Sequence, residues 1–399
     1  MFFEFTAQTS SLLFFWVQSL IFAILLLKKG VENQDQASKC LSLFILLACL
    51  YYTPWMCGYS GWYAKDGFRD FLFFVPFQQF FLIGPVIYFY TLFLLQPDFR
   101  LSRRDYLHFL PATLYLLYSL IVFVTDFLIL DEYYFYADGR DKDLSPWYQI
   151  SGLASMIIYV VLSIRTYRQY RRRIVEELSY ADAVRYNWMQ KYLIALLVIL
   201  SLRIGFFIAY PNYGAFGPKF WYYFFFAALA YYIAFEAYAH GLKSGIAPFF
   251  STLASQNDRS VLAESPPKEV KAPLAGEAFS AGKKQILALM ESEKMYQNPT
   301  LSLNDVAQTL NITSKQVSQI INQGFEMNFN DFVNHYRVNA FKEHIARGEH
   351  EKFTLLSIAL SCGFNSKTTF NRVFKRNTGI TPLQFVGSTA SAPRKRPKS

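Results

Sequence analysis

Long apolar stretches dominate the first 240 residues of the chain. Seven can be recognised, at roughly 10–27, 41–60, 71–95, 106–130, 147–164, 190–210 and 220–240. Each has about the 20 residues that a helix needs to cross a hydrocarbon layer of ~30 Å. We expect kinks or interruptions at Pro54, Pro76, Pro85 and Pro111. The pattern predicts an all-α fold in which residues 1–240 form a bundle of seven transmembrane helices.

Helical spacing of another kind begins near residue 300. Ser302 followed by Asp305 is a helix-capping signal, and Asn311 tolerates the left-handed conformation that ends a short helix. Four apolar residues between them have the spacing of one helix face: Leu303, Val306, Ala307 and Leu310. These residues predict a short amphipathic helix that is followed by a turn.

A second amphipathic helix is predicted directly after that turn. Thr313 and Gln316 form its capping box, and Val317, Ile320 and Ile321 give it a buried face. Its outer face carries polar side chains, among them Lys315, Ser318 and Gln319. Two short helices joined by a tight turn are typical of a helix-turn-helix motif.

The same pattern returns about 52 residues later. Its first helix contains Leu355, Ile358 and Ala359, and its turn contains Gly363 and Phe364. The next helix, over about 366–376, buries Phe370 and Phe374 and exposes Lys367, Thr368, Asn371 and Arg372. A connecting helix is predicted over 328–347. Such a connection would let two recognition helices enter successive major grooves, ~34 Å apart.

Residues 241–279 separate the two halves of the chain. They are rich in Ser, Ala, Pro and Gly and lack a sustained period, so we expect a flexible linker. The stretch from Gly276 to Lys284 is one residue too long for a phosphate loop, and Lys284 stands where a Ser or Thr would bind magnesium. The predicted domains are therefore residues 1–240, the linker 241–279, a DNA-binding domain at 280–386 and a basic tail at 387–399.

Composition supports a lipid environment for much of the chain. Of 399 residues, 53% are hydrophobic and only 17% are charged, which is too apolar for an ordinary soluble enzyme. The charge is also uneven, because residues 280–399 contain 16 Lys and Arg against 8 Asp and Glu. That basic excess suits a surface that meets phosphate.

Loop charges predict the orientation of the bundle. The first, third and fifth loops are rich in Lys and Arg, whereas the fourth is acidic. By the positive-inside rule, the N-terminus is outside and the C-terminus is cytoplasmic. An odd number of spans places the basic C-terminal part on the same side as the chromosome.

Two ionisable residues, Asp126 and Arg203, lie within apolar stretches near the predicted outer face. They are expected to form an intramembrane ion pair or a polar site that binds a signal. Glu236 lies too deep to pair with Arg203. The cysteines and histidines have no metal-ligand spacing, and the chain has no recognisable nucleophile-base pair, so we expect no metal, no cofactor and no enzyme activity.

The C-terminal motifs resemble those of the AraC-type (AraC/XylS) transcription regulators over roughly residues 281–386. The residues that carry the resemblance are Ile358-Ala359, Cys362-Gly363-Phe364, Phe370-Asn371-Arg372-Val373-Phe374-Lys375-Arg376 and Gly379-Ile380-Thr381-Pro382. The connecting helix also has the family's Arg, at Arg337. Two positions depart from the family pattern: Glu326 stands where a Gly is common, and Phe341 where an Ala is common.

The resemblance implies that both recognition helices bind promoter DNA. The base-facing residues would be Lys315, Ser318, Gln319, Lys367, Thr368, Asn371 and Arg372. Their chemistry agrees, because Arg and Lys donate to guanine, and Asn and Gln pair with adenine. Lys375 and Arg376 suit phosphate, and the tail residues Arg394, Lys395, Arg396 and Lys398 would add nonspecific attraction.

These patterns together predict a membrane-embedded transcription regulator in the bacterial cytoplasmic (inner) membrane, whose bundle senses an unknown signal. Its expected partners are double-stranded promoter DNA, membrane lipid, RNA polymerase, a signal ligand and a second copy of the chain in a homodimer. Two alternatives stay open. In the first, the chain is a membrane enzyme or transporter with a C-terminal regulatory module. In the second, the C-terminal domain is a protein-interaction module that does not bind DNA.

Overall fold

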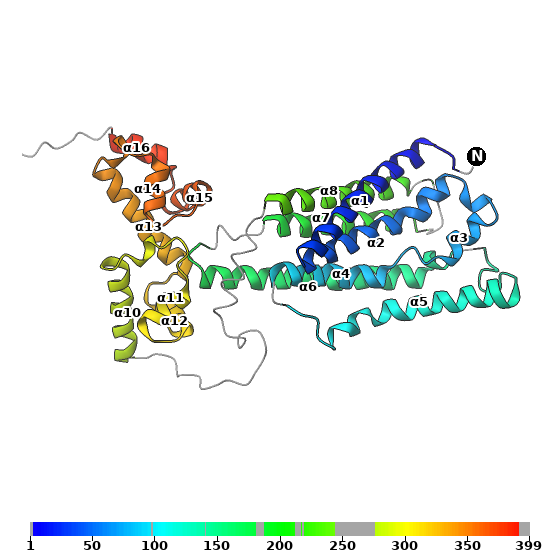
Figure 1. Cartoon of the computed structure of the whole chain (residues 1–399), viewed down its shortest axis with the longest axis horizontal. Helices are drawn as coiled ribbons and strands as arrows, with labels where there is room; N and C mark the ends of the chain where they lie inside the picture. Colours follow the sequence, from blue (N-terminus) through cyan, green and yellow to red (C-terminus); the bar gives the residue numbers. More distant parts are fainter. Residues whose placement is uncertain are drawn as a thin grey trace, which may run out of the picture. The chain divides into compact units, whose positions relative to one another are not determined.

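The computed structural model describes residues 3–96, 99–139, 141–180, 187–211, 217, 219–243 and 276–390 (Figure 1). Its regular elements are all helices, and no strand occurs among these residues. The chain divides into two compact units. The N-terminal unit contains Met1–Arg168 and Tyr186–Glu264, and the C-terminal unit contains Gln169–Arg185 and Ser265–Ser399. The fold is therefore all-α, as predicted.

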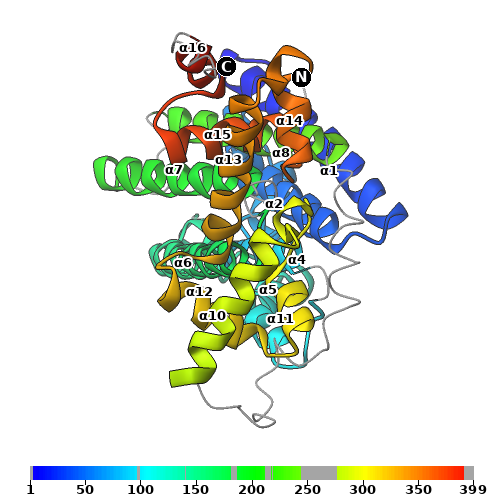
Figure 2. The same cartoon turned by 90° about the vertical axis from the view of Figure 1, so that its left-hand side faces the viewer.

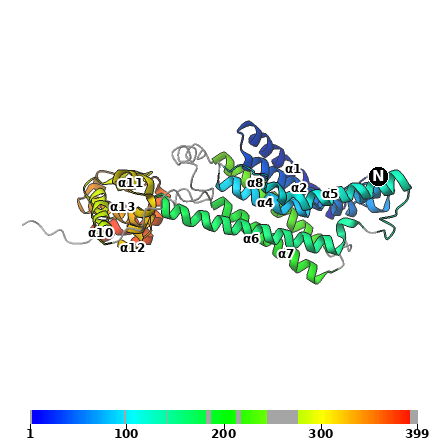
Figure 3. The same cartoon turned by 90° about the horizontal axis from the view of Figure 1, so that it is seen from below.

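Long apolar helices build the N-terminal unit (Figure 3). They are α1 (Ala7–Glu32), α2 (Gln36–Tyr59), α3 (Phe68–Phe74), α4 (Phe80–Leu95), α5 (Leu110–Phe123), α6 (Pro146–Glu177), α7 (Asn187–Ala209) and α8 (Phe220–Lys243). Helix α2 packs against α1, α4 and α8 and contributes many of the buried side chains. Short helical turns η1 (Trp62–Ala64) and η4 (Lys142–Leu144) lie in connections, whereas η2 (Asp105–Phe109) and η3 (Val124–Leu130) directly precede and follow α5.

Six spans among the described residues are long and apolar enough to cross a membrane: Ala7–Glu32, Gln36–Tyr59, Asp105–Leu130, Pro146–Glu177, Trp188–Ala209 and Phe220–Ala239. The remaining predicted span, 71–95, is divided into α3 and α4. Pro76 lies in the break, as expected, whereas Pro54 and Pro85 lie inside α2 and α4 without ending them. Pro111 occupies the first turn of α5, where a missing backbone N–H costs nothing.

The C-terminal unit is a cluster of shorter helices around one core (Figure 2). They are α10 (Gly276–Glu291), α11 (Leu303–Leu310), α12 (Ser314–Gly324), α13 (Phe329–Ala346), α14 (Leu355–Ser361), α15 (Lys367–Thr378) and α16 (Pro382–Ala390), with the turns η5 (Met295–Gln297) and η6 (Glu349–Glu351). Helix α13 contacts α12, α14 and α15. It therefore joins the two predicted helix-turn-helix motifs.

Two features of this unit differ from the predicted domain boundaries. Helix α10 begins at Gly276, inside the predicted linker, and Lys283 on it donates to the carbonyl oxygen of Gly324 at the end of α12. The segment that follows α6, Leu178 to Tyr180, is also buried in this unit. Most of the linker, residues 244–275, and the basic tail from residue 391 lie outside the described residues.

Candidate functional site

The first helix-turn-helix motif forms with the caps that its sequence predicts. Ser302 and Asp305 make a reciprocal capping box at the start of α11, and Thr313 and Gln316 make another at the start of α12. Asn311 ends α11 in the left-handed conformation, at φ 54° and ψ 38°. Each box satisfies backbone N–H groups that a helix start would leave unpaired. Hydrogen bonds within a few residues therefore determine where α11 ends and α12 begins.

Burial divides α12 into an inner and an outer face. Val317, Ile320 and Ile321 are buried in the core. On the outer face Lys315 is exposed, and Ser318 and Gln319 are half-buried. The amide of Gln319 donates to Gln323, and Asn322 donates to Ser318, both one helical turn apart. Lys315, Ser318 and Gln319 are the side chains of this motif that are predicted to meet base edges, and all three lie on α12.

The second motif, α14 to α15, requires glycine at its turn. Gly363 has φ +93°, and a Cβ added there would lie 2.2 Å from the carbonyl oxygen of Tyr296. No L side chain fits that combination of backbone conformation and close approach. Phe364 follows it into the core, and Ser366 then caps α15 by accepting from the N–H of Thr369.

Helix α15 also has a buried face and an exposed polar face. Phe370 and Phe374 are buried, as the pattern predicts. Four side chains on the other face are exposed: Lys367, Thr368, Asn371 and Arg372. Lys and Arg supply donors for guanine, and Asn supplies a donor and an acceptor for adenine. The face thus has the chemistry needed to read bases.

The two cations predicted to meet phosphate have different surroundings. Lys375 is exposed near the end of α15. Arg376 donates to the carboxylate of Asp331 on α13, in an ion pair whose side chains are 50% and 41% exposed. Arg376 therefore also ties α15 to the connecting helix.

Both departures from the family pattern are accommodated in the backbone and core. Glu326, between α12 and α13, has φ 55°, the left-handed conformation for which glycine is usual. Phe341 is fully buried, and its ring lies 4.7 Å from Phe370 and 5.3 Å from Phe374, centroid to centroid. The larger side chain thus fills space between α13 and α15.

Among the described residues of the C-terminal unit, Arg337 is the most deeply buried cation, with 2% of its surface exposed. Its Nε donates to the carbonyl oxygen of Tyr296 at 2.8 Å, and Nη2 donates to that of Asn298 at 2.7 Å. Burial lowers the pKa of Arg337 to about 10, so the guanidinium stays charged at neutral pH. A buried charge of this kind is tolerated only when its donors are satisfied.

The structure does not bring Asp126 and Arg203 together, although an ion pair between them was one expectation. Asp126 accepts from the backbone N–H groups of Phe135 and Tyr136 in the loop that follows it in the sequence. Arg203 donates to Gln149, at 3.1 Å to the backbone oxygen and 3.0 Å to the side-chain oxygen. Its guanidinium carbon also lies 4.1 Å from the ring centroid of Phe80. Asp126 and Arg203 are therefore each bonded to other residues among those described.

A buried polar network surrounds Arg203 instead, and sequence reasoning missed it. The amide of Gln149 donates to the side chain of Gln78 and to the backbone oxygen of Asp143, each at 2.7 Å. Asp143 accepts from the backbone N–H of Gln78 at 2.9 Å and from the hydroxyl of Tyr115. The network therefore joins α5, α6 and α7 to the segments around Gln78 and Asp143.

Close packing of α4 on α6 supports this network. A Cβ at Gly152 would lie 2.5 Å from the Cβ of Phe80, so a larger residue there would displace Phe80, whose ring contacts Arg203. Small residues at such a crossing are common where transmembrane helices approach closely. The two glutamines and the glycine carry no strong periodic signal, which explains why the sequence did not reveal the network.

Two carboxylates at the edge of the network are unusually buried. Asp141 is 6% exposed and Asp143 is 5% exposed, and both lie in the loop between α5 and α6. Burial raises the pKa of Asp143 to about 6. Burial and the neighbouring charge of Asp143 hold the pKa of Asp141 well above its usual range. Protonation of this pair is therefore accessible in mildly acidic surroundings.

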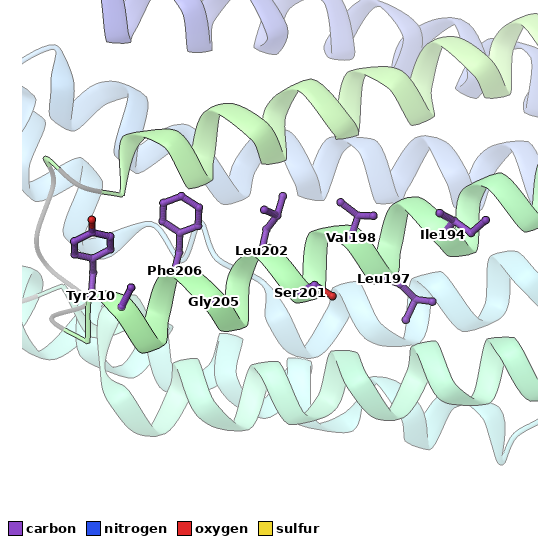
Figure 4. A pocket seen from close by; sticks show the side chains of 9 residues that line it. Ile194, Leu197, Val198, Ser201, Leu202, Gly205, Phe206 and Tyr210 are labelled. Atoms are coloured by element: carbon purple, nitrogen blue, oxygen red, sulfur yellow. The ribbon is translucent and has the colours of Figure 1, made fainter.

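An apolar groove of about 630 Å³ runs along α7 (Figure 4). Val198, Leu202 and Phe206 line it with neighbours from the same helix, and Ser201 and Tyr210 are its polar members. A surface made by one helix with so few polar groups has the composition expected of a lipid-facing surface. Among the described residues, no cluster of His, Cys, Asp and Glu has an arrangement that could hold a metal ion.

Residues 306–388 match the family model described as a helix-turn-helix domain. The match begins within α11 and ends within α16, so it includes α12 and α15, the two predicted recognition helices. Comparison of the chain with curated proteins and with solved structures gave no significant match. The motifs, their caps and this match agree: residues 306–388 form a helix-turn-helix domain, and its motifs are similar to those of the AraC-type regulators.

Proposed function

We propose that this chain is a membrane-embedded regulator that binds promoter DNA in a sequence-specific way through α12 and α15. The observation that carries the proposal is the pair of complete helix-turn-helix motifs on one core, each with an exposed polar face. Two such faces bind DNA more tightly than one because they are linked and bind together. The Asn, Gln, Arg and Lys side chains of these faces favour contacts with bases over purely electrostatic binding to phosphates.

The apolar helices support attachment to a membrane. Six of the described spans have the length and composition to cross a bilayer. In the proposed arrangement the N-terminus is outside, the C-terminal unit is in the bacterial cytoplasm, and RNA polymerase and a second copy of the chain are partners at the promoter. Protease added to intact cells should leave the C-terminal unit whole, whereas cleavage of that unit would contradict this orientation.

Genomic footprinting with the full-length protein in lipid nanodiscs tests DNA binding. We expect protected fragments for the wild type and weaker protection for Arg372→Ala and Lys315→Ala. Lys284→Ala is the matched control, because it removes an exposed lysine from α10, which contributes none of the proposed base contacts. No protection by the wild type at low salt would exclude DNA binding.

The network around Arg203 is the best-supported place for signal sensing in the N-terminal unit. Ions and amides inside an apolar bundle are costly, and they are commonly associated with function. Arg203→Leu should abolish the response to the signal while membrane insertion stays normal. A promoter reporter that responds equally in this variant would remove the network from consideration as the sensor.

A further inference from the structure

A three-residue segment that follows α6 is part of the C-terminal core. Leu178, Ser179 and Tyr180 are 7%, 1% and 3% exposed. They belong to the same compact unit as the helix-turn-helix motifs, although more than a hundred residues of sequence separate them from the first motif. The segment therefore occupies a site within the DNA-binding unit.

One side of this site is the backbone directly ahead of α11. The N–H of Ser179 donates to the carbonyl oxygen of Leu301 at 3.1 Å, and its hydroxyl donates to the same oxygen at 2.6 Å. Leu178 and Ser302 form an antiparallel bridge. Because Ser302 caps α11, the segment is bonded to the start of the first helix-turn-helix motif.

The other side of the site is the connecting helix α13. The amide of Asn330 donates to the carbonyl oxygens of Leu178 and Ser179, at 3.1 and 2.9 Å. Arg337 donates to the carbonyl oxygen and the hydroxyl of Ser179, at 3.2 and 3.1 Å. Asn330 and Arg337 are each 2% exposed, so without the segment their donors would lose these partners.

Arg337 extends these contacts to the second motif. The same guanidinium holds the loop at Tyr296 and Asn298, and its Nε would lie 3.0 Å from a Cβ at Gly363. Gly363 forms the turn between α14 and α15. One side chain therefore links the segment, the loop ahead of the first motif and the turn of the second.

The helix that carries the segment is unusually long. Helix α6 has 32 residues, a length of about 48 Å at ~1.5 Å per residue, whereas a hydrocarbon layer is ~30 Å thick. Leu178 follows the last residue of α6 directly. A displacement or rotation of this helix would therefore act on the segment without an intervening flexible connection.

We propose that Leu178–Tyr180 is a built-in ligand of the DNA-binding unit. Its docking holds the two helix-turn-helix motifs in the arrangement that binds DNA, and its withdrawal by α6 lowers DNA affinity. The regulatory part of this inference rests on the proposed function, whereas the docking of the segment does not. The chain thereby has a route from the N-terminal helices to DNA binding that is separate from the linker.

Two substitutions in the full-length protein test the inference from opposite sides of the site. Asn330→Asp keeps the size of the side chain but turns a carboxylate toward two carbonyl oxygens. Ser179→Ala removes one hydroxyl from the segment and leaves α13 untouched. Asn339→Asp is the matched control, because it makes the same charge change on a more exposed turn of α13.

Hydrogen exchange of the Ser179 amide reports docking, and anisotropy with a footprinted promoter fragment reports DNA affinity. In nanodiscs we expect Asn330→Asp to speed exchange at Ser179 and to weaken DNA binding, each about tenfold, and Ser179→Ala to have the same effects at about threefold. Asn339→Asp should stay within about twofold of the wild type. Slow exchange in α12 and α15 of each variant shows that the unit remains folded.

Fast exchange of Ser179 in the wild type would overturn the docking itself. Faster exchange at Ser179 in Asn330→Asp with unchanged DNA affinity would overturn the regulatory role. A wild type that protects no DNA, although Ser179 exchanges slowly, would refute the proposed function and the regulatory role but leave docking supported. The exchange and affinity measurements thus separate the two failures.

Discussion

The ring of Phe341 on α13 lies 4.7 Å from the ring of Phe370 on α15, at an interplanar angle of 52°. Both side chains are buried. This contact joins the connecting helix α13 to α15, the second predicted recognition helix. The position of α15 on the core therefore depends on an aromatic pair.

Phe341→Ala should destabilise the C-terminal unit by about 3–5 kcal/mol, because it removes a buried ring and leaves a cavity. Hydrogen exchange of α15 amides in the full-length protein, with increasing denaturant, measures the loss. Leu383→Ala is a suitable control, since Leu383 is 75% exposed. A loss below about 1 kcal/mol would mean that α15 collapses onto α13 without cost.

Glu326→Gly should stabilise the C-terminal unit by about 1 kcal/mol, because Glu326 has φ 55° and a left-handed non-glycine residue costs roughly 1–2 kcal/mol. The midpoint of denaturant unfolding measures the gain. Glu326→Ala removes the same charge but keeps a Cβ, so it should give no comparable gain. Equal stabilisation by both variants would assign the effect to charge instead.

The buried carboxylate pair should make the stability of the N-terminal unit depend on pH. The pKa of Asp143 is raised from 3.8 to about 6, so the folded state holds this proton more tightly than the unfolded state. Its stabilising contribution is complete below about pH 3.8 and is lost as the pH rises through about 6. Asp141 adds to the same trend, because its pKa is also raised.

Thermal unfolding between pH 4 and pH 7 measures this dependence. The double variant Asp141→Asn/Asp143→Asn should flatten the profile, since neither amide titrates. Asp66→Asn, which changes a carboxylate that is 91% exposed, should leave the profile as it is. A profile unchanged by the double substitution would place the titrating groups elsewhere.

Arg372→Ala and Lys375→Ala should affect DNA binding in different ways. Loss of a base contact at Arg372 should cost about 1–3 kcal/mol and relax the preference at one base pair. Loss of a phosphate contact at Lys375 should weaken all sequences alike and lower the salt dependence by about one counterion. Binding titrations on specific and scrambled fragments at several salt concentrations distinguish the two. Identical profiles would contradict the assigned roles.

Local patterns predicted the C-terminal motifs well. The capping boxes at Ser302 and Thr313 and the turn at Asn311 are each determined within a few residues, so the sequence reveals them directly. The same holds for the buried face of α15. The division of the third apolar stretch into α3 and α4 was only partly foreseen, because a proline indicates a break without showing how the chain continues.

Long-range polar contacts were not predictable. Ser179 bonds to residues 122 and 158 positions away, and Gln149 bonds to Gln78, 71 positions away. A serine or glutamine has no periodic signature, and its partner is determined only by the fold. The ion pair predicted as one possibility for Asp126 and Arg203 is not formed. Depth in a membrane, from which it was predicted, does not show which helices are neighbours.

Under the proposed function, the ion pair between Arg376 and Asp331 affects the rate at which the protein finds its DNA site. A carboxylate beside the end of α15 partly cancels the positive potential that would draw in a polyanion. Complexes with nonspecific DNA are then shorter-lived, because binding releases fewer of the counterions that are condensed on the DNA. In the proposed function the regulator is held in a membrane and meets only the chromosome segments that diffuse to it, and brief sampling of each segment helps such a search.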